Sequence, residues 1–168
     1  LLDLDLSNMV QMDCALPAGL LAEKLISLVQ KQVDEGIDTV FFTNSGTEAV
    51  EGAIKFARGA TSRERILFLD HAFHGLTLGS LSANGNGEFR DGFGPLLPGQ
   101  KIELDHIEQL EKELRKKDVA AFLFEPILGK GLYAPSEKFL KEAERLCKKH
   151  GTLLIADEVQ AGLGRTGT

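Results

Sequence analysis

The sequence has few cysteines, no tryptophan and no hydrophobic run long enough to cross a membrane. Its two cysteines, Cys14 and Cys147, stand far apart and match no metal-binding or redox spacing, which favours a reducing compartment over a disulfide framework. The most apolar stretch, VAAFLFEPIL, is interrupted by Glu125 and Pro126, and the N-terminus lacks the pattern of a secretory signal. These absences predict a cytoplasmic protein without a membrane span.

An excess of positive charge is also absent. The 168 residues carry a net charge of −6 and the sequence pI is near 5.3, which argues against a nucleic acid or an anionic membrane as the partner. The small basic cluster at residues 115–117 ends a helical pattern, where the helix dipole favours cations. Hydrophobic residues make up 43% of the chain, enough for one compact globular domain.

Apolar runs typical of buried strands alternate with helical patterns along the chain. Strands are predicted at residues 38–43, 65–70, 119–127 and 152–160. Helices are predicted at residues 19–36, 46–60, 105–117 and 136–151, and a long loop rich in glycine and proline at 82–100. This alternation predicts a three-layer α/β/α fold with a mostly parallel sheet and helices on both faces.

All four predicted helices have apolar residues at helical spacing. In the helix at 19–36 they are Leu21, Leu25, Leu28, Val29 and Val33, and in the helix at 105–117 they are Ile107, Leu110 and Leu114. In the helix at 46–60 the expected face is small and consists of Ala49, Ala53, Phe56 or Ala57, and Ala60. The helix at 136–151 has Ser136 as its N-cap, Gly151 after its last turn, and an apolar face made of Phe139, Leu140, Ala143, Leu146 and Cys147.

Each predicted strand ends in polar or aromatic residues that a plain α/β domain would not require. These groups are NSGT at 44–47, DHAFHG at 70–75, EP at 125–126 and DEVQ at 157–160. Because the carboxyl ends of parallel strands lie along one edge of a sheet, we expect the four groups to converge on one ligand site.

The NSGT turn has the features of a phosphate site. A helix start offers free N–H groups and partial positive charge, and Ser45 and Thr47 add hydroxyl donors. Gly46 lets the backbone approach a ligand closely. The alternative is an ordinary helix N-cap, because serine and threonine are common there.

The other strand ends offer groups for a flat cationic ring. Asp157 could stabilise a protonated ring nitrogen, or pair with an arginine, a lysine or a helix N-terminus. Gln160 could donate a hydrogen bond to a ligand oxygen, or it could be a loop residue without a ligand. Phe73 could stack on a flat ligand, or it could pack in the core. For Glu125 the alternative is a buried carboxylate bonded to the backbone.

His71 and His74 are spaced as HxxH, but no third ligand accompanies them, so we expect no metal site. One of the two could line the pocket, but we favour a hydrogen-bonded or surface position for both. The other groups together offer a phosphate-binding turn, an aromatic ring that could stack on a flat ligand, a carboxylate for a ring nitrogen and an amide for a ring oxygen. Pyridoxal 5′-phosphate is a molecule that satisfies all four.

Five segments, in unbroken order, closely resemble the class III aminotransferases. They are FFTNSGTEAVEGAIKFAR, DHAFHGLTLGSLS, FRDGFGPLLPG, FLFEPI and GTLLIADEVQAGLGRTG. These aminotransferases are pyridoxal-phosphate enzymes of fold type I, a group that includes ornithine, 4-aminobutyrate and putrescine aminotransferases. The resemblance runs from about Leu16 to Thr168. It implies a homodimeric enzyme that moves an amino group from an amine or amino acid to a keto acid.

Matched position by position, the resemblance assigns residues to the cofactor's phosphate and ring faces. Gly46 and Thr47, with Ser45 beside them, match the phosphate-binding turn. Phe73 matches the aromatic residue that stacks on one face of the ring, and Val159 matches the residue that packs on the opposite face.

The resemblance also assigns the residues around the edge of the ring. Asp157 matches the carboxylate that pairs with the pyridinium nitrogen, and Gln160 matches the amide near the phenolic oxygen. Glu125 matches a site glutamate whose position affects substrate binding. A protonated ring nitrogen makes the ring an electron sink for the carbanion formed when the substrate loses its α-proton.

The chain departs from the family pattern in one loop and at one further position. The family commonly reads Gln-Gly-Glu-Gly where this chain has LGKG at 128–131, and threonine is usual at the position of Ala161. Leu128 removes an amide and Lys130 reverses a charge, and we expect both changes near the pocket rim, where they could tune the substrate.

In the family the lysine that forms the Schiff base follows the Gly-Arg-Thr-Gly motif, and this sequence stops at Thr168, directly after that motif. We therefore expect residues 1–168 to be a partial large domain, inactive alone, without the lysine, the small domain or the segment by which a neighbouring subunit completes the phosphate site. One alternative is a non-catalytic α/β domain that binds a phosphorylated ligand or serves in assembly. Within the family, a pyridoxal-phosphate decarboxylase or aminomutase is the other alternative.

Overall fold

The computed structural model describes residues 15–33 and 36–167, and the chain forms two compact units, residues 1–43 and 44–168. The first unit contains the helix α1 (Leu16–Val29), which has Pro17 in its first turn, where a missing N–H costs nothing. No residue of α1 is buried. The helix ends at Val29, earlier than its predicted end, and the Gln30 side chain donates a hydrogen bond to the carbonyl of Ile37 over 2.8 Å.

The strand predicted at residues 38–43 is wrong. These residues have no regular secondary structure, and the side chains of Phe41 and Phe42 are 65% and 44% exposed. Aromatic and β-branched residues favour a strand, but a strand forms only where it aligns with a neighbouring strand. All four strands of the described sheet lie in the second unit.

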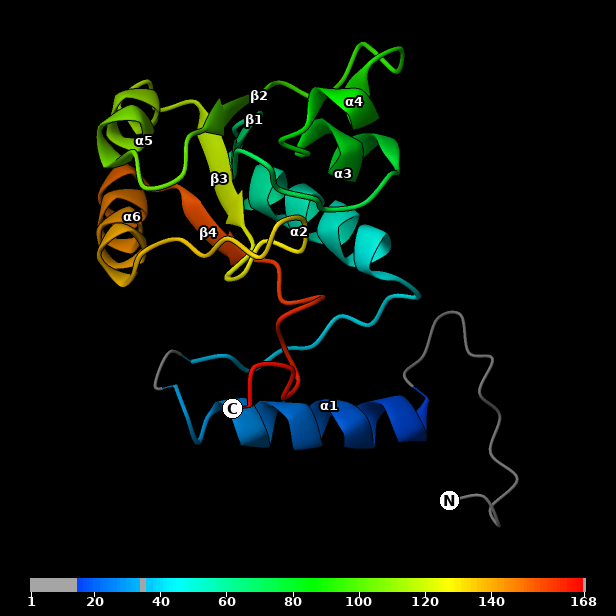
Figure 1. Ribbon diagram of the computed structural model, residues 1–168. Coiled ribbons are helices and arrows are strands. Elements are labelled where there is room, and N and C mark those ends of the chain that lie inside the picture. Colours follow the sequence, from blue (N-terminus) through cyan, green and yellow to red (C-terminus); the bar gives the residue numbers. More distant parts are fainter. Residues whose placement is uncertain (1–14, 34–35, 168) are drawn as a thin grey trace. The chain divides into compact units, whose positions relative to one another are not determined.

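The second unit is built on a parallel sheet with the strand order β2-β1-β3-β4 (Figure 1). The strands are β1 (Arg65–Leu69), β2 (Gly99–Ile102), β3 (Val119–Phe124) and β4 (Leu153–Ala156). Three of them match predicted strands, whereas β2 begins inside the stretch predicted as a loop. Its sequence, GQKI, has a single apolar residue and so carries little signal for a strand.

Five helices belong to the second unit. They are α2 (Gly46–Thr61), α3 (Leu78–Ser82), α4 (Gly87–Arg90), α5 (Ile107–Leu114) and α6 (Glu137–His150). In Figure 1, α5 and α6 lie on one side of the sheet and α2 lies on the other. The predicted three-layer α/β/α fold with a parallel sheet is confirmed. None of the described helices is long and apolar enough to cross a membrane.

Alternate residues of the central strands face opposite helical layers. Leu67 and Phe122 pack in the cluster that includes residues of α5 and α6, whereas Phe68 and Leu123 pack in the cluster that includes residues of α2. This period of two follows from the pleat of a strand. Because helices cover both faces, β1 and β3 need no polar alternation, which explains their continuous apolar sequences.

The packing face predicted for α2 is wrong except at Ala57. The helix buries Val50, Ile54 and Ala57, which are spaced four and three residues apart, while Phe56 is 58% exposed. The other alanines expected on that face are exposed or half-buried. The larger aliphatic side chains remove more apolar area from water than alanine does, so they determine which face turns inward.

The helix α6 agrees with its prediction. The Ser136 side chain accepts a hydrogen bond from the Phe139 N–H over 3.2 Å, and Gly151 has the left-handed backbone conformation with φ of 64°. Its buried residues are Phe139, Ala143, Leu146 and Cys147. Burial raises the pKa of the Cys147 thiol to about 12. Cys14 lies outside the described residues.

The strand β4 forms as predicted, but the expectation that it is buried is wrong. Leu153 and Leu154, whose side chains point to opposite faces, are 42% and 37% exposed. β4 is an edge strand of the described sheet, whereas β1 and β3 lie in its centre under α2, α5 and α6. The centre of the sheet therefore carries the core.

Candidate functional site

The carboxyl ends of β1, β3 and β4 meet the start of α2 at one pocket of about 220 Å³. Its lining residues are Gly46, Thr47, Phe73, His74, Gly75, Glu125, Asp157, Val159 and Gln160. Seven of the eight candidate residues from the sequence lie among them, and Ser45 stands next to the pocket as the N-cap of α2. The four groups therefore converge as expected, although the group at 44–47 follows no strand and reaches the pocket through the start of α2.

The start of α2 is fixed by reciprocal hydrogen bonds. The Ser45 hydroxyl accepts from the Glu48 N–H over 3.4 Å, and the Glu48 carboxylate accepts from the Asn44 N–H over 2.7 Å. A Cβ at Gly46 would lie 2.9 Å from Cγ1 of Val159, so only glycine fits without a shift. Ser45 thus has the N-cap role that the sequence left open, and the helix start brings its partial positive charge to the pocket.

Asp157 lines the pocket, and its side chain is only 5% exposed. Its Oδ2 atom is 2.7 Å from Nδ1 of His74, and its Oδ1 atom accepts from the Val159 N–H over 3.1 Å. The Asp157 N–H donates to the carbonyl of Phe124 over 2.8 Å, which extends the ladder between β3 and β4. The partner of this buried carboxylate is thus a histidine, and not the arginine, lysine or helix N-terminus considered from the sequence.

The two histidines have different positions. The His74 side chain is fully buried, and its Nε2 atom has no hydrogen-bond partner among the described residues. The His71 side chain is 58% exposed and lies 3.8 Å from Asp70. Both positions agree with the expectation of hydrogen-bonded or surface histidines, and His74 is the one of the pair that lines the pocket. Residues 15–33 and 36–167 contain no group of three histidine, cysteine, aspartate or glutamate residues placed to hold a metal ion.

Glu125 is buried and bonds two loops of the site. Its Oε2 atom accepts from the Phe73 N–H over 2.9 Å, and its Oε1 atom accepts from the Gly129 N–H over 3.0 Å. This geometry corresponds to the backbone-bonded carboxylate that the sequence left as an alternative. Both oxygens hold main-chain groups, so the carboxylate fixes the backbone that carries the ring of Phe73.

Phe73 lines the pocket, and its ring packs against Phe89 of α4. Its centroid is 5.3 Å from that of Phe89 in an edge-to-face arrangement, and the ammonium group of Lys130 lies 5.1 Å from the Phe89 centroid. Lys130 also pairs with Glu88 and does not line the pocket. The expectation that Leu128 lies at the pocket rim is wrong, since its side chain is 1% exposed and packs in the core.

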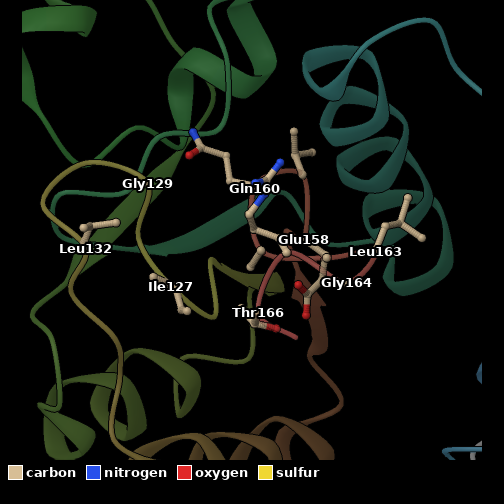
Figure 2. A pocket seen from close by; sticks show the side chains of 12 residues that line it. Ile127, Gly129, Leu132, Glu158, Gln160, Leu163, Gly164 and Thr166 are labelled. Carbon is tan, nitrogen blue, oxygen red and sulfur yellow. The ribbon is translucent and has the colours of Figure 1, made fainter. Parts of the chain in front are cut away.

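A second, more open cavity of about 1000 Å³ adjoins the first and shares Val159 and Gln160 with it. Figure 2 shows Ile127, Gly129 and Leu132 on the loop after β3 and Gln160 on the turn after β4. A Cβ at Gly129 would lie 2.6 Å from the Gln160 amide nitrogen, so the absence of a side chain at Gly129 leaves room for the Gln160 amide. Gln160 therefore stands between the two cavities.

Two neighbours of the pocket, Thr77 and Ser80, were missed from the sequence alone, and Gly75 was named only as part of the group DHAFHG. The Thr47 hydroxyl oxygen is 2.8 Å from Oγ1 of Thr77 and 2.7 Å from Oγ of Ser80. Gly75 has a φ of +120°, and a Cβ there would lie 2.4 Å from the Thr47 hydroxyl. The segment GLTLGS contains hydroxyls and two glycines, which is a weak signal unless its distance from Thr47 is known.

Known proteins are similar to this chain in both sequence and fold. The sequence profile of the family "Aminotransferase class-III" matches residues 6–168. An acetylornithine aminotransferase of Bacillus anthracis is 45% identical over 150 residues, which cover 88% of this chain and 38% of that protein. An amine transaminase from an uncultivated Pseudomonas species, solved in its PLP-bound form, matches 99% of this chain and 44% of its own, with a TM-score of 0.88 and 29% identity.

An ornithine aminotransferase of Toxoplasma gondii, with partial occupancy of PLP at its active site, has a TM-score of 0.86 and 29% identity over 99% of this chain and 40% of its own. The chain thus spans less than half the length of these relatives. The family profile covers nearly the whole sequence, and the structural matches have the same parallel α/β/α architecture. The chain belongs to the class III aminotransferase family.

Proposed function

We propose that this chain supplies part of the cofactor-binding domain of a pyridoxal-phosphate transaminase, an enzyme that moves an amino group from an amine or amino acid to a keto acid. The observation that carries the proposal is the buried pair of Asp157 and His74, 2.7 Å apart, in the pocket to which α2 brings its N-terminus. The pocket thus combines a fixed negative charge and a positive helix end, and a compact ligand with a cationic ring and a phosphate has the complementary charges.

The donor set fits this cofactor. The N–H groups at the start of α2 would hold the phosphate, and Gly46 leaves the backbone there without a side chain in the way. The Asp157 carboxylate would accept a hydrogen bond from the ring nitrogen. Phe73 and Val159 would flank the two ring faces, and Gln160 would approach the phenolic oxygen.

When bound, pyridoxal phosphate supplies an electron sink for the negative charge that develops as the substrate loses its α-proton. The residues of this chain prepare the site for that charge. The negative charge of Asp157 favours a proton on a neighbouring ring nitrogen, and the hydrogen bond from His74 holds the carboxylate in one orientation. Glu125 fixes the loop that carries Phe73 by accepting its N–H.

The named relatives support amino acids, amines and keto acids as the substrate classes, since they include acetylornithine and ornithine aminotransferases and an amine transaminase. We further propose a cytoplasmic homodimer in which the lysine that reacts with the cofactor lies outside residues 1–168. Lys55 and Lys130 do not line the pocket. The 168-residue chain is then expected to bind cofactor without turning over substrate.

An absorbance titration with pyridoxal phosphate tests the proposal on the 168-residue chain. Asp157→Ala is expected to weaken saturable binding about tenfold or more, because it removes a buried, charged hydrogen-bond acceptor. The matched control is Asp70→Ala, which also follows a strand but pairs with Lys101 and does not line the pocket. This control should bind as the parent chain does.

Borohydride reduction followed by intact mass and peptide mapping completes the test. We expect no stoichiometric lysine adduct. An adduct on one defined lysine would show that the chain supplies the reactive amine itself and would overturn the incomplete site. Absence of saturable binding in the parent chain would contradict the proposal and favour a non-catalytic α/β domain.

A further inference from the structure

The hydroxyl of Thr47 belongs to a compact network that a simple phosphate seat would not require. It contacts the hydroxyls of Thr77 and Ser80 at 2.8 Å and 2.7 Å, and those two hydroxyl oxygens are 3.1 Å apart. Ser80 is completely buried. The φ of +120° at Gly75 and its missing Cβ leave the space in which the three oxygens meet. The network lies directly beside the start of α2.

Glu51 anchors this network one helical turn after Thr47. Its Oε1 atom accepts from the Thr77 hydroxyl over 2.5 Å, and from the N–H groups of Gly79 and Ser80 over 2.8 Å and 3.1 Å. An ionised carboxylate accepts hydrogen bonds and donates none. The single hydroxyl proton of Thr77 is therefore committed to Glu51, and the Thr77 oxygen is left as an acceptor.

The remaining protons allow two arrangements. The Ser80 hydroxyl can donate to the carbonyl of Thr77 over 3.1 Å or to the Thr47 oxygen over 2.7 Å. If Ser80 donates to Thr47, the proton of Thr47 is free to point toward the pocket that Thr47 lines. If Ser80 donates to the carbonyl, Thr47 can direct its proton back to Thr77 or Ser80. An anion at the start of α2 favours the first arrangement, because consecutive hydrogen bonds polarise one another.

We propose that Ser80, oriented by Glu51 and Thr77, is a positioning residue that makes the Thr47 hydroxyl a hydrogen-bond donor to a phosphate group at the start of α2. The proposal rests on the proposed function and adds one residue of α3, Ser80, to the residues that act on the phosphate site. It assigns Ser80 no contact with the ligand. Its effect is confined to ligands that carry the phosphate.

The test compares two ligands that differ only in that group, pyridoxine 5′-phosphate and pyridoxine. Neither carries an aldehyde, so neither forms an adduct with surface lysines. Binding of both ligands is measured by calorimetry on the 168-residue chain. We expect Ser80→Ala to weaken binding of the phosphorylated ligand about tenfold, the effect of losing one hydrogen bond to a charged group, and to change the affinity for pyridoxine less than about twofold.

Ser82→Ala is the matched control, because Ser82 is a buried serine of the same helix. Its hydroxyl donates to the carbonyl of Leu78 over 2.6 Å and accepts from the Leu97 N–H over 3.0 Å, away from Thr47. This variant should keep the preference of the parent for the phosphorylated ligand. If Ser80 had only a structural role, Ser80→Ala would lower the affinities for both ligands together. If the integrity of α3 determined binding, Ser82→Ala would lower both affinities as well.

Two further single variants and one double variant separate the proposed hydrogen-bond relay, in which Ser80 donates to Thr47 and Thr47 to the phosphate, from damage to the fold. Thr77→Val keeps the shape of the side chain, removes the donor to Glu51, and should lose the same preference as Ser80→Ala. Thr47→Val should lose it too, and Thr47→Val combined with Ser80→Ala should lose no more than Thr47→Val alone, because both act through one hydroxyl. Additive losses would overturn the relay.

The failures of the two proposals are distinguishable. A parent chain that prefers the phosphorylated ligand, together with a Ser80→Ala variant that keeps that preference, would overturn the relay and leave the proposed function standing. A parent chain that binds both ligands equally, or binds neither, would contradict the proposed phosphate seat itself.

Discussion

At the scale of single residues, Glu125 carries two main-chain hydrogen bonds of the site and is 3% exposed. Glu125→Ala would leave the N–H groups of Phe73 and Gly129 without their acceptor, so we expect a loss of roughly 2 kcal/mol or more in the free energy of unfolding. Glu125→Gln keeps one acceptor oxygen and should lose less. Urea denaturation of the three chains measures both effects.

The control for Glu125 is Glu158→Ala, an exposed carboxylate on the turn after β4. It should change the urea midpoint little. If Glu125→Ala were as stable as Glu158→Ala, the two hydrogen bonds would contribute nothing measurable and Phe73 would have to be held by its packing on Phe89 alone.

The sequence predicted the site residues at strand ends because parallel strands align their carboxyl ends without further information. It could not predict their partners. Asp157 and His74 are 83 positions apart, and Thr47 and Ser80 are 33 positions apart. Such pairs depend on the register of the sheet and on the path of the loops. Leu128 was misplaced for the same reason, because its burial follows from the turn that the loop makes after β3.

At the scale of elements, Ser136 joins α6 to the loop before α5. Its hydroxyl accepts from the Phe139 N–H and donates to Oδ1 of Asp105 over 2.9 Å. Ser136→Ala should therefore lower the free energy of unfolding by about 1 kcal/mol or slightly more, the usual cost of a lost N-cap. Ser136→Thr keeps a hydroxyl in the same place and should recover most of it. Thermal and urea unfolding of the two variants check the difference.

An Ala variant as stable as the parent chain would show that water replaces the serine hydroxyl at both of its partners. The helix would then owe its stability to its packed face, Phe139, Ala143, Leu146 and Cys147, and not to its cap.

Elements whose signals are local were predicted best. The helix α6 has a cap, a periodic apolar face and a terminal glycine within its own sequence, and the structure has all three. Which face of α2 is buried depends on which side chains fit against the sheet. Whether residues 38–43 form a strand depends on whether a neighbouring strand is there to pair with. The short strand β2 has little apolar pattern and pairs with β1 through its backbone. These features are properties of the assembled sheet, so a single segment does not reveal them.

At the scale of the whole molecule, charge is arranged differently at the two ends of the sheet. The carboxyl ends of the strands carry the pocket, whereas an ion-pair cluster lies at the opposite end, where β1 and β3 begin. There Arg65 is 2.5 Å from Glu113 and 2.9 Å from Asp118, and Lys116 is 2.7 Å from Glu113. The cluster connects α5 to the start of β1, so it affects the stability of the fold without touching the site.

This cluster makes the free energy of unfolding depend on pH in the acidic range. Burial by itself raises the pKa of Glu113, but the hydrogen bonds from Arg65 and Lys116 outweigh it, and the pKa is lowered from its ordinary value of 4.5. The unfolded chain therefore binds a proton at this carboxyl more readily than the folded chain does. The stability that Glu113 contributes is complete above about pH 4.5, and it is lost as the pH falls through the lower pKa of the folded state.

Glu113→Gln removes this contribution, so we expect the variant to be less stable than the parent chain at neutral pH. The difference between the two should shrink as the pH falls below the ordinary pKa of the carboxyl and through its lower pKa in the folded state, where the folded parent carries an uncharged side chain as well. Urea midpoints measured from neutral to acid pH test this, with Glu108→Gln, an exposed position on the same helix, as the control. A constant difference across that range would mean that Glu113 stabilises the fold by packing and neutral hydrogen bonds, and not by its charge.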